Sequence, residues 1–150
     1  MANKTVEILL IEDNPNDIEL TLYALKKYRV AERVDIVRDG VEALEYLFCT
    51  GMYTHRQTED VPKLILLDLK LPKMDGLEVL RHIKANTRTQ SIPVIALTSS
   101  REEADVRESY RLGVNSYIVK PIDFESFTEL IRRLGTYWLI HNQFPVATQG

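Results

Sequence analysis

Residues 64–67 most constrain the fold, because Leu64-Ile-Leu-Leu67 is an unbroken apolar run that ends at a carboxylate, Asp68. Such a run is typical of a strand buried on both faces, as the strands of parallel sheets are. Asp75-Gly76 then signals a turn and the start of a helix. Open α/β sheets bind ligands at the carboxyl ends of their strands. Asp68 is therefore either part of a site or a residue that merely ends the strand.

Five segments with strand patterns alternate with five that have the apolar spacing of helices. The strands are predicted at 6–11, 33–37, 64–67, 92–97 and 117–119, and the helices at 15–28, 41–48, 77–85, 101–112 and 124–134. Asn14 and Asp123 are the expected N-caps of the first and last helices. Residues 33–37 alternate in polarity, which indicates a strand near the sheet edge. The alternation of strands and helices predicts an α/β fold, a doubly wound parallel sheet with helices on both faces.

Polar side chains follow four of these strands at the point where each one ends. They are Glu12, Asp13, Asp68, Thr98 and Lys120. Parallel strands end at the same edge of a sheet, so we expect these groups to share one site. Carboxylates suit Mg²⁺, and a phosphoryl group needs a nucleophile, a metal and donors for its oxygens. Asp68 would be the nucleophile, the acid pair Glu12 and Asp13 the metal ligands, and Thr98 and Lys120 the oxygen partners. Taken singly, Lys120 could instead pair with an acid and Thr98 could cap the following helix.

The composition of the chain excludes several classes of protein. The 150 residues suffice for one domain, and the net charge of −3 comes without a basic block, so no nucleic-acid binding is expected. The chain has no signal-peptide core and no apolar stretch long enough for a membrane span, which favours a cytoplasmic protein. Phosphate-binding glycine loops, a Gly-x-Ser-x-Gly elbow and a His-Glu-x-x-His motif are absent from the sequence.

Two segments fall outside the alternating pattern. Residues 51–63 are polar and irregular, which predicts an inserted surface loop in which His55 is a solvated residue rather than a metal ligand. The segment from Tyr137 to Pro145 is aromatic and apolar. It would either fold back on the domain or bury against a second chain, and we favour dimerisation.

The rim residues lie in motifs that resemble those of the receiver domains of two-component response regulators. The resemblance covers about residues 5–134 and rests on Ile11-Glu-Asp-Asn14, Leu67-Asp68 with Leu71-Pro72 and Asp75-Gly76, Leu97-Thr-Ser99, and Tyr117-Ile-Val-Lys-Pro121. It implies a flavodoxin-like five-stranded sheet in the order 2-1-3-4-5 with five helices. It also implies a phosphoacceptor signalling protein, not an enzyme beyond weak self-catalysed phosphotransfer and autodephosphorylation.

The resemblance assigns roles to individual residues. Asp68 would accept a phosphoryl group from a histidine kinase, while Glu12, Asp13, Asp68 and the backbone carbonyl of Lys70 would hold Mg²⁺, with Mn²⁺ as a substitute. Thr98 and Lys120 would bind the phosphoryl oxygens, and Tyr117 would swing inward as the surface of helix 4, strand 5 and helix 5 changes. A cis peptide bond is expected before Pro121.

The insert and the C-terminal extension further resemble those of the small, single-domain response regulators paired with cyanobacterial phytochromes. This implies one receiver domain over residues 1–150, with 135–150 as an extension that contacts a second copy through Tyr137, Trp138 and Phe144. The kinase would be a phytochrome.

Lys70 departs from the neutral residue that many receivers have two positions after the acceptor. It either sets the phosphoryl lifetime or is a solvated loop lysine.

Three rival functions deserve comparison. A phosphorylation-independent binding module on the same fold would typically lose the acceptor or the acid pair, and this chain keeps both. A phosphatase with an aspartyl nucleophile would place a second acid where Lys70 stands. A flavodoxin-like cofactor protein would need phosphate-binding glycines in the first loop, which has none.

Overall fold

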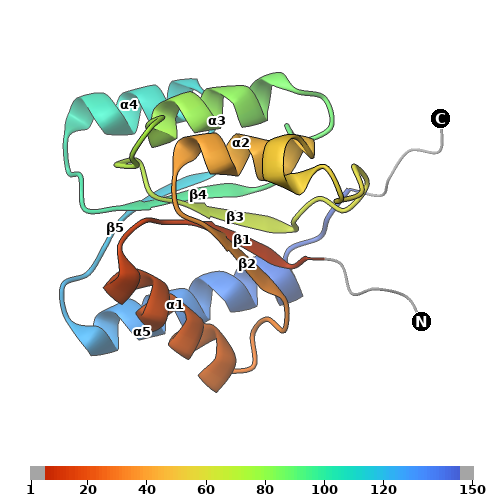
Figure 1. The fold of residues 1–150 in the computed structure, drawn as a ribbon. Helices are drawn as coiled ribbons and strands as arrows, with labels where there is room; N and C mark the ends of the chain where they lie inside the picture. Colours follow the sequence, from red (N-terminus) through yellow and green to blue (C-terminus); the bar gives the residue numbers. More distant parts are fainter. Residues whose placement is uncertain (1–5, 146–150) are drawn as a thin grey trace.

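The structure is a computed structural model that describes residues 6–145. It contains a five-stranded parallel sheet in the order β2-β1-β3-β4-β5 (Figure 1). The strands are β1 Ile8–Ile11, β2 Val34–Val37, β3 Leu64–Leu67, β4 Val94–Thr98 and β5 Ser116–Val119. Both the α/β fold and the strand order predicted from the sequence are confirmed.

Burial of the strands follows their position in the sheet. Every residue of β1, β3 and β4 is buried, whereas β5 and most of β2 are half-buried. The central strands are covered on both faces and are therefore almost wholly apolar. The edge position that the alternating residues 33–37 indicated is confirmed for β2.

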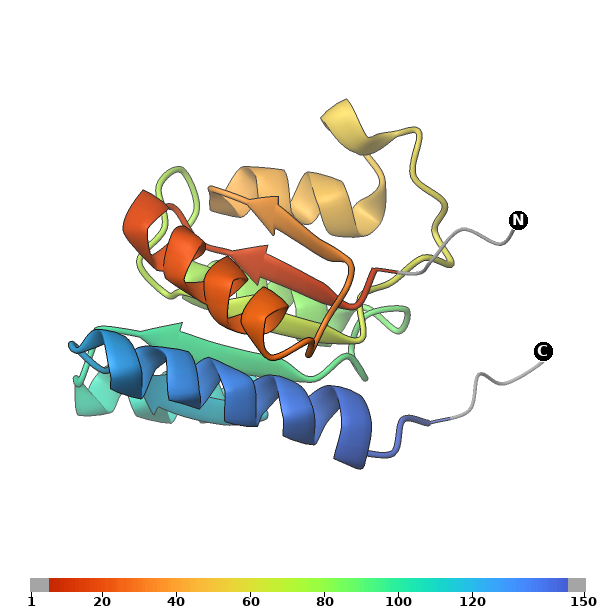
Figure 2. The ribbon, with the colours of Figure 1, turned by 90° about the horizontal axis from the view of Figure 1, so that it is seen from below.

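Helices cover the two faces of the sheet unequally. The helices are α1 Pro15–Lys27, α2 Gly40–Phe48, α3 Gly76–Ala85, α4 Glu103–Arg111 and α5 Phe124–Thr136. Helices α1 and α5 lie side by side on one face, and α2, α3 and α4 lie on the other (Figures 1 and 2). One apolar core lies on each face, with Ile65 and Leu67 of β3 in one and Leu64 and Leu66 in the other. Successive side chains of β3 thus pack into opposite cores, so a shift of the strand by one residue would exchange the two sets, and the register is fixed.

Most helices begin at the carboxyl edge of the sheet with a side-chain cap. Asn14 accepts hydrogen bonds from the backbone N–H groups of Asn16 and Asp17, and Asp123 caps α5 through Ser126. Asp39 and Asp75 cap α2 and α3 in the same way. The predicted caps Asn14 and Asp123 are confirmed. Each cap sets the residue at which the loop after a strand ends and the following helix begins.

The insert after α2 is a surface loop, as predicted. It begins with a short 3₁₀ helix, η1 Gly51–Tyr53, and His55 is exposed. Figure 2 shows this segment projecting beyond the end of α2. Arg56 donates to the carbonyl oxygens of Tyr46 and Asp60, and Arg88 donates to that of Thr58. Two arginines thus tie the insert to the body of the domain.

The C-terminal extension continues α5 as one π-helical segment, η2 Tyr137–His141. Trp138 packs against the core shared by α1 and α5, and Phe144 lines a pocket with Val61 and Ile92. Tyr137 and Ile140 are 53% and 62% exposed. The extension therefore folds back in part and leaves an apolar remainder in solvent. The ends of the predicted domain, 1–5 and 146–150, lie outside the described residues.

The prediction of a cis peptide bond before Pro121 is wrong. No cis peptide bond occurs in the described range 6–145. The trans form is intrinsically favoured even before proline, by roughly 0.5–1 kcal/mol.

Gly76 is required by the close approach of α3 to the end of β3. A Cβ atom at this position would lie 2.4 Å from the Asp68 carbonyl oxygen and 2.5 Å from the Leu69 Cα. We expect Gly76→Ala to lower the free energy of unfolding by about 1–3 kcal/mol, because the backbone around Asp68 must shift. Urea unfolding measures this. Alanine is ordinarily better than glycine in a helix, so unchanged or increased stability would contradict the clash.

Candidate functional site

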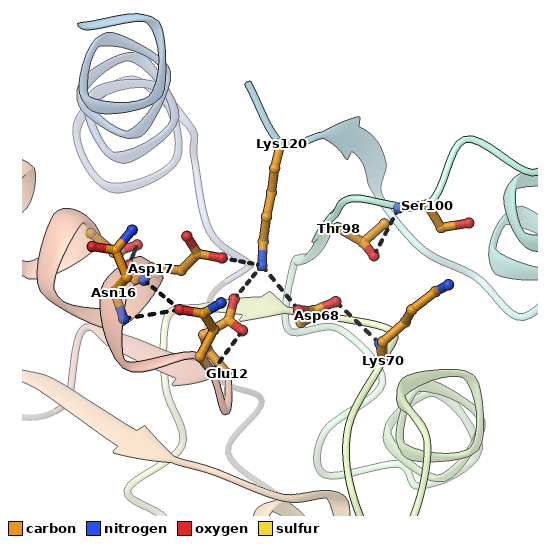
Figure 3. Close-up of polar contacts among 10 residues, drawn as sticks. Glu12, Asn16, Asp17, Asp68, Lys70, Thr98, Ser100 and Lys120 are labelled. Carbon is orange, nitrogen blue, oxygen red and sulfur yellow. Dashed lines mark hydrogen bonds and ion pairs between the residues drawn. The ribbon is translucent and has the colours of Figure 1, made fainter. Parts of the chain in front are cut away.

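The polar residues at the strand ends converge at one edge of the sheet (Figure 3). Glu12 and Asp13 follow β1, Asp68 follows β3 and Lys120 follows β5, while Thr98 is the last residue of β4. Ion pairs join Lys120 to both Glu12 and Asp68 across the sheet. The structure thus brings the side chains of Glu12, Asp13, Asp68 and Lys120 together, as predicted, and it places Thr98 at the same edge of the sheet.

Lys120 lies at the centre of the cluster. Its ammonium donates to Glu12 Oε1 at 2.7 Å, to Asp17 Oδ2 at 2.8 Å and to Asp68 Oδ2 at 3.0 Å. Burial by itself would lower the pKa of Lys120, but the hydrogen bonds to Asp17 and Glu12 outweigh it and raise the pKa above its usual range. The lysine is therefore a fixed positive charge at neutral pH.

Asp68 is held on both of its carboxylate oxygens. Oδ2 accepts from Lys120, and Oδ1 accepts from the backbone N–H of Lys70 at 3.1 Å. The residue is 8% exposed, so its carboxylate is nearly buried. The side chain of Lys70 is exposed. Asp68 is thus a fixed carboxylate with an ammonium beside it.

Glu12 is the most buried acid of the site, with 3% of its surface exposed. Its Oε2 accepts from the backbone N–H of Asn14 at 3.2 Å. Burial raises the pKa of Glu12 from 4.5 to about 7, against the hydrogen bond from Lys120, which lowers it. The proximity of Asp68 adds to the rise. A cation bound at this site would favour the charged carboxylate and so oppose both causes of the raised pKa, burial and the nearby charge of Asp68.

The three acids Glu12, Asp13 and Asp68 form a group suited to a divalent cation. One carboxylate oxygen of each lies within 4.8 Å of those of the other two. Asp13 is exposed, which leaves the group open to solvent on one side. Mg²⁺ prefers hard oxygen ligands and keeps several waters, so a half-open carboxylate group fits it. The carbonyl of Lys70 stays a predicted ligand.

Thr98 and Tyr117 meet at Ser100 rather than at Asp68. Thr98 is fully buried, and its Oγ1 accepts from the Ser100 N–H at 3.3 Å. The Tyr117 hydroxyl donates to the Ser100 carbonyl at 2.9 Å, and burial raises the pKa of this phenol. The Ser100 hydroxyl donates to Asp105 Oδ2 at 2.6 Å. Ser100 therefore links the two predicted switch residues to the start of α4.

Two residues of this site were not predicted from the sequence. Asp17 lies in the first turn of α1, where acids are common because they favour the helix terminus, so nothing marked it as a lysine partner. Ser100 stands within a polar run after β4 that suggested a helix start. The role of Asp17 as a partner of Lys120 is apparent only from the structure, because the two residues are 103 positions apart in the chain.

The site combines a nearly buried aspartate beside a lysine, an acid group that could hold a divalent cation and a buried threonine, on a sheet of order 2-1-3-4-5. This combination is that of the receiver domains of signalling proteins. The chain belongs to the response regulator receiver domain family, whose model matches residues 8–132.

Several relatives share nearly the whole chain. Response regulator Rcp1 of Synechocystis is 38% identical over 97% of this chain and 97% of its own length. The probable methanogenesis regulatory protein FilR2 of Methanothrix harundinacea is 39% identical over 92% of this chain and 86% of its own. The solved structure of the phosphorylated cyanobacterial phytochrome response regulator RcpA superimposes with a TM-score of 0.88 at 40% identity, covering 95% of this chain and all of RcpA. The chain is thus a response regulator homologous to these proteins.

The raised pKa of Glu12 predicts how stability depends on pH in the absence of metal. Between pH 4.5 and about 7 the folded protein keeps a proton on Glu12 that the unfolded chain has released. The free energy of unfolding should therefore fall as the pH rises through this range, by up to about 1.4 kcal/mol per pH unit. Urea unfolding in EDTA measures it, and Glu12→Gln should flatten the slope. An identical slope in Glu12→Gln would contradict this origin.

Proposed function

We propose that this protein is a stand-alone response regulator that accepts a phosphoryl group on Asp68 from a histidine kinase in a Mg²⁺-dependent reaction. The observation that carries the proposal is the position of Asp68, whose carboxylate accepts a hydrogen bond from the Lys120 ammonium and belongs, with Glu12 and Asp13, to an acid group open to solvent. One carboxylate oxygen would attack phosphorus while the bond from phosphorus to the donor's imidazole nitrogen breaks. The imidazole leaves with the electron pair, and Asp68 becomes an acyl phosphate.

The chain's own residues would stabilise the transferred group. Lys120 carries a fixed positive charge, and the buried hydroxyl of Thr98 is available as a donor to a phosphoryl oxygen. Glu12, Asp13 and Asp68 would hold Mg²⁺, which supplies charge neutralisation when bound. One solved relative is the Mn²⁺-bound form of response regulator Rcp1, which supports a divalent cation here and Mn²⁺ as a substitute.

The signal would leave the site through Ser100. If the Thr98 hydroxyl turns toward a phosphoryl group, the Ser100 N–H loses its acceptor and the loop that also holds Tyr117 and Asp105 must adjust. Tyr117 belongs to β5 and Asp105 to α4, so the surface of α4, β5 and α5 would change. A local charge event would thus alter an interaction surface.

We also propose a kinase, a cellular location and a class of downstream partner for this protein. RcpA is described as a phytochrome response regulator, which supports a phytochrome as the kinase. We infer a cytoplasmic signalling protein, not an enzyme, whose downstream partner is a protein, since the net charge of −3 disfavours nucleic acid. None of the helices in residues 6–145 has the length and apolar composition that crossing a bilayer requires.

A phosphorylation-independent binding module remains the rival function, and one experiment separates the two. The protein is incubated with acetyl phosphate and Mg²⁺, and the intact mass is measured for wild type, Asp68→Asn and the exposed-site control Glu103→Gln. We expect one added phosphoryl mass on wild type and control and none on Asp68→Asn, because the amide cannot act as the nucleophile. Absence of label on wild type would favour the binding module, and equal label on Asp68→Asn would remove Asp68 from its role.

We also propose that the C-terminal extension contributes to a homodimer. Among the predicted contact residues, Tyr137 is exposed, whereas Trp138 and Phe144 are half-buried against their own domain. Ile140, which lies on the same segment, is also exposed. In the described part of the extension, up to Pro145, Tyr137 and Ile140 are therefore the large apolar side chains most exposed to a partner chain.

Substitution of these two residues tests the dimer without disturbing the core. Tyr137→Ser combined with Ile140→Ser should weaken self-association at least tenfold, because both side chains lose apolar contact area. Sedimentation velocity over a concentration series measures it. Met52→Ser, at a residue 79% exposed in the insert, is the matched control. An unchanged mass distribution in the double variant would exclude these residues as the interface.

A further inference from the structure

Of the three carboxylates that accept from the Lys120 ammonium, Asp17 alone lies outside the acid group that could hold a metal ion. Its Oδ2 lies 2.8 Å from the Lys120 ammonium, and its side chain is 21% exposed. The group of acids suited to a cation comprises Glu12, Asp13 and Asp68 only, within the described part of the chain. Asp17 therefore needs a different explanation from the acids beside it.

The backbone of Asp17 is fixed, so its carboxylate has a defined reach. Its N–H donates to the Asn14 cap, and its carbonyl accepts from the Thr21 hydroxyl at 2.7 Å. Figure 3 shows Asp17 and Glu12 approaching the ammonium from the α1 side, with Asp68 opposite. Asp17 thus binds Lys120 to the first turn of α1.

Hydrogen-bond capacity makes this contact consequential. An ammonium has three N–H donors, and Lys120 has three carboxylate acceptors. A phosphoryl oxygen can therefore gain a bond from Lys120 only if one carboxylate gives its bond up. A cation would draw on Glu12 and Asp68, which leaves Asp17 as the remaining competitor for the ammonium.

We infer that Asp17 is a positioning residue that restrains the Lys120 ammonium on the α1 side and competes with the phosphoryl group for it. This inference rests on the proposed function of Asp68. The competition weakens retention of the phosphoryl group, because its oxygens share one ammonium with a fixed carboxylate. A neutral side chain at this position would release the lysine toward Asp68.

The competition is tested with beryllofluoride, which imitates a phosphoryl group on an aspartate, in the presence of Mg²⁺. Titration calorimetry compares wild type with three variants, Asp17→Asn, Asp17→Glu and the control Glu19→Gln. Glu19 is an exposed acid on the same helix, so the control matches the change in charge. We expect Asp17→Asn to bind about fivefold more tightly, the size of one partly exposed ion pair. Asp17→Glu should return toward wild type, and Glu19→Gln should match wild type.

A second measurement needs neither metal nor ligand. In EDTA, exchange of the Lys120 ammonium protons with water is followed by NMR of ¹⁵N-lysine-labelled protein, with Lys120→Arg used for assignment. Asp17→Asn should speed this exchange at least threefold, because one of three acceptors no longer carries a charge. A role of Asp17 confined to the stability of α1 would leave the exchange unchanged.

The outcomes separate the inference from the proposed function. Equal or weaker beryllofluoride binding by Asp17→Asn, or unchanged ammonium exchange, overturns the role of Asp17. If beryllofluoride fails to bind wild type, the proposed function fails and the competition fails with it. The exchange measurement then still decides whether Asp17 restrains Lys120.

Discussion

The site depends on the ion pairs of the Lys120 ammonium, because it holds together three carboxylates that would otherwise repel one another. Glu12 after β1, Asp17 in α1 and Asp68 after β3 each place a carboxylate within 3.0 Å of it. Removing one partner of a buried charge cluster leaves the others unpaired, which costs more than the net gain from forming the pair. The lysine therefore holds the carboxyl edge of the sheet together, and in the proposed function the same ammonium also binds the phosphoryl group.

The sequence alone predicted the sheet, because an unbroken apolar run such as Leu64–Leu67 has few alternatives in a chain that also shows regular helical spacing. The site followed from the same pattern, since parallel strands bring their ends to one edge. Asp68, Glu12 and Lys120 could be found in this way because each directly follows a strand. Their convergence is a property of the fold, so it needed no knowledge of side-chain geometry.

Other features could not be predicted, each for a physical reason. The contact of Asp17 with Lys120 depends on the phase of the first turn of α1, and an acid there is equally well explained by the helix terminus. The link from Thr98 through Ser100 to Asp105 depends on a loop conformation that polar residues alone do not specify. The peptide bond before Pro121 follows a small energy difference that a resemblance cannot decide. Burial of Trp138 depends on how far α5 continues beyond the sheet.

The capped helix starts have one more consequence, which concerns the electric field at the carboxyl edge of the sheet. Helices α1, α2, α3 and α5 all begin there behind the caps Asn14, Asp39, Asp75 and Asp123. The amino end of a helix carries about half a positive charge, spread over backbone N–H groups that no substitution of a side chain removes. Part of the negative potential of the acid cluster is thus offset by the main chain itself. The carboxylates alone would make this edge of the sheet repel anions. The repulsion is weaker than their number suggests, because the helix amino ends supply positive potential there.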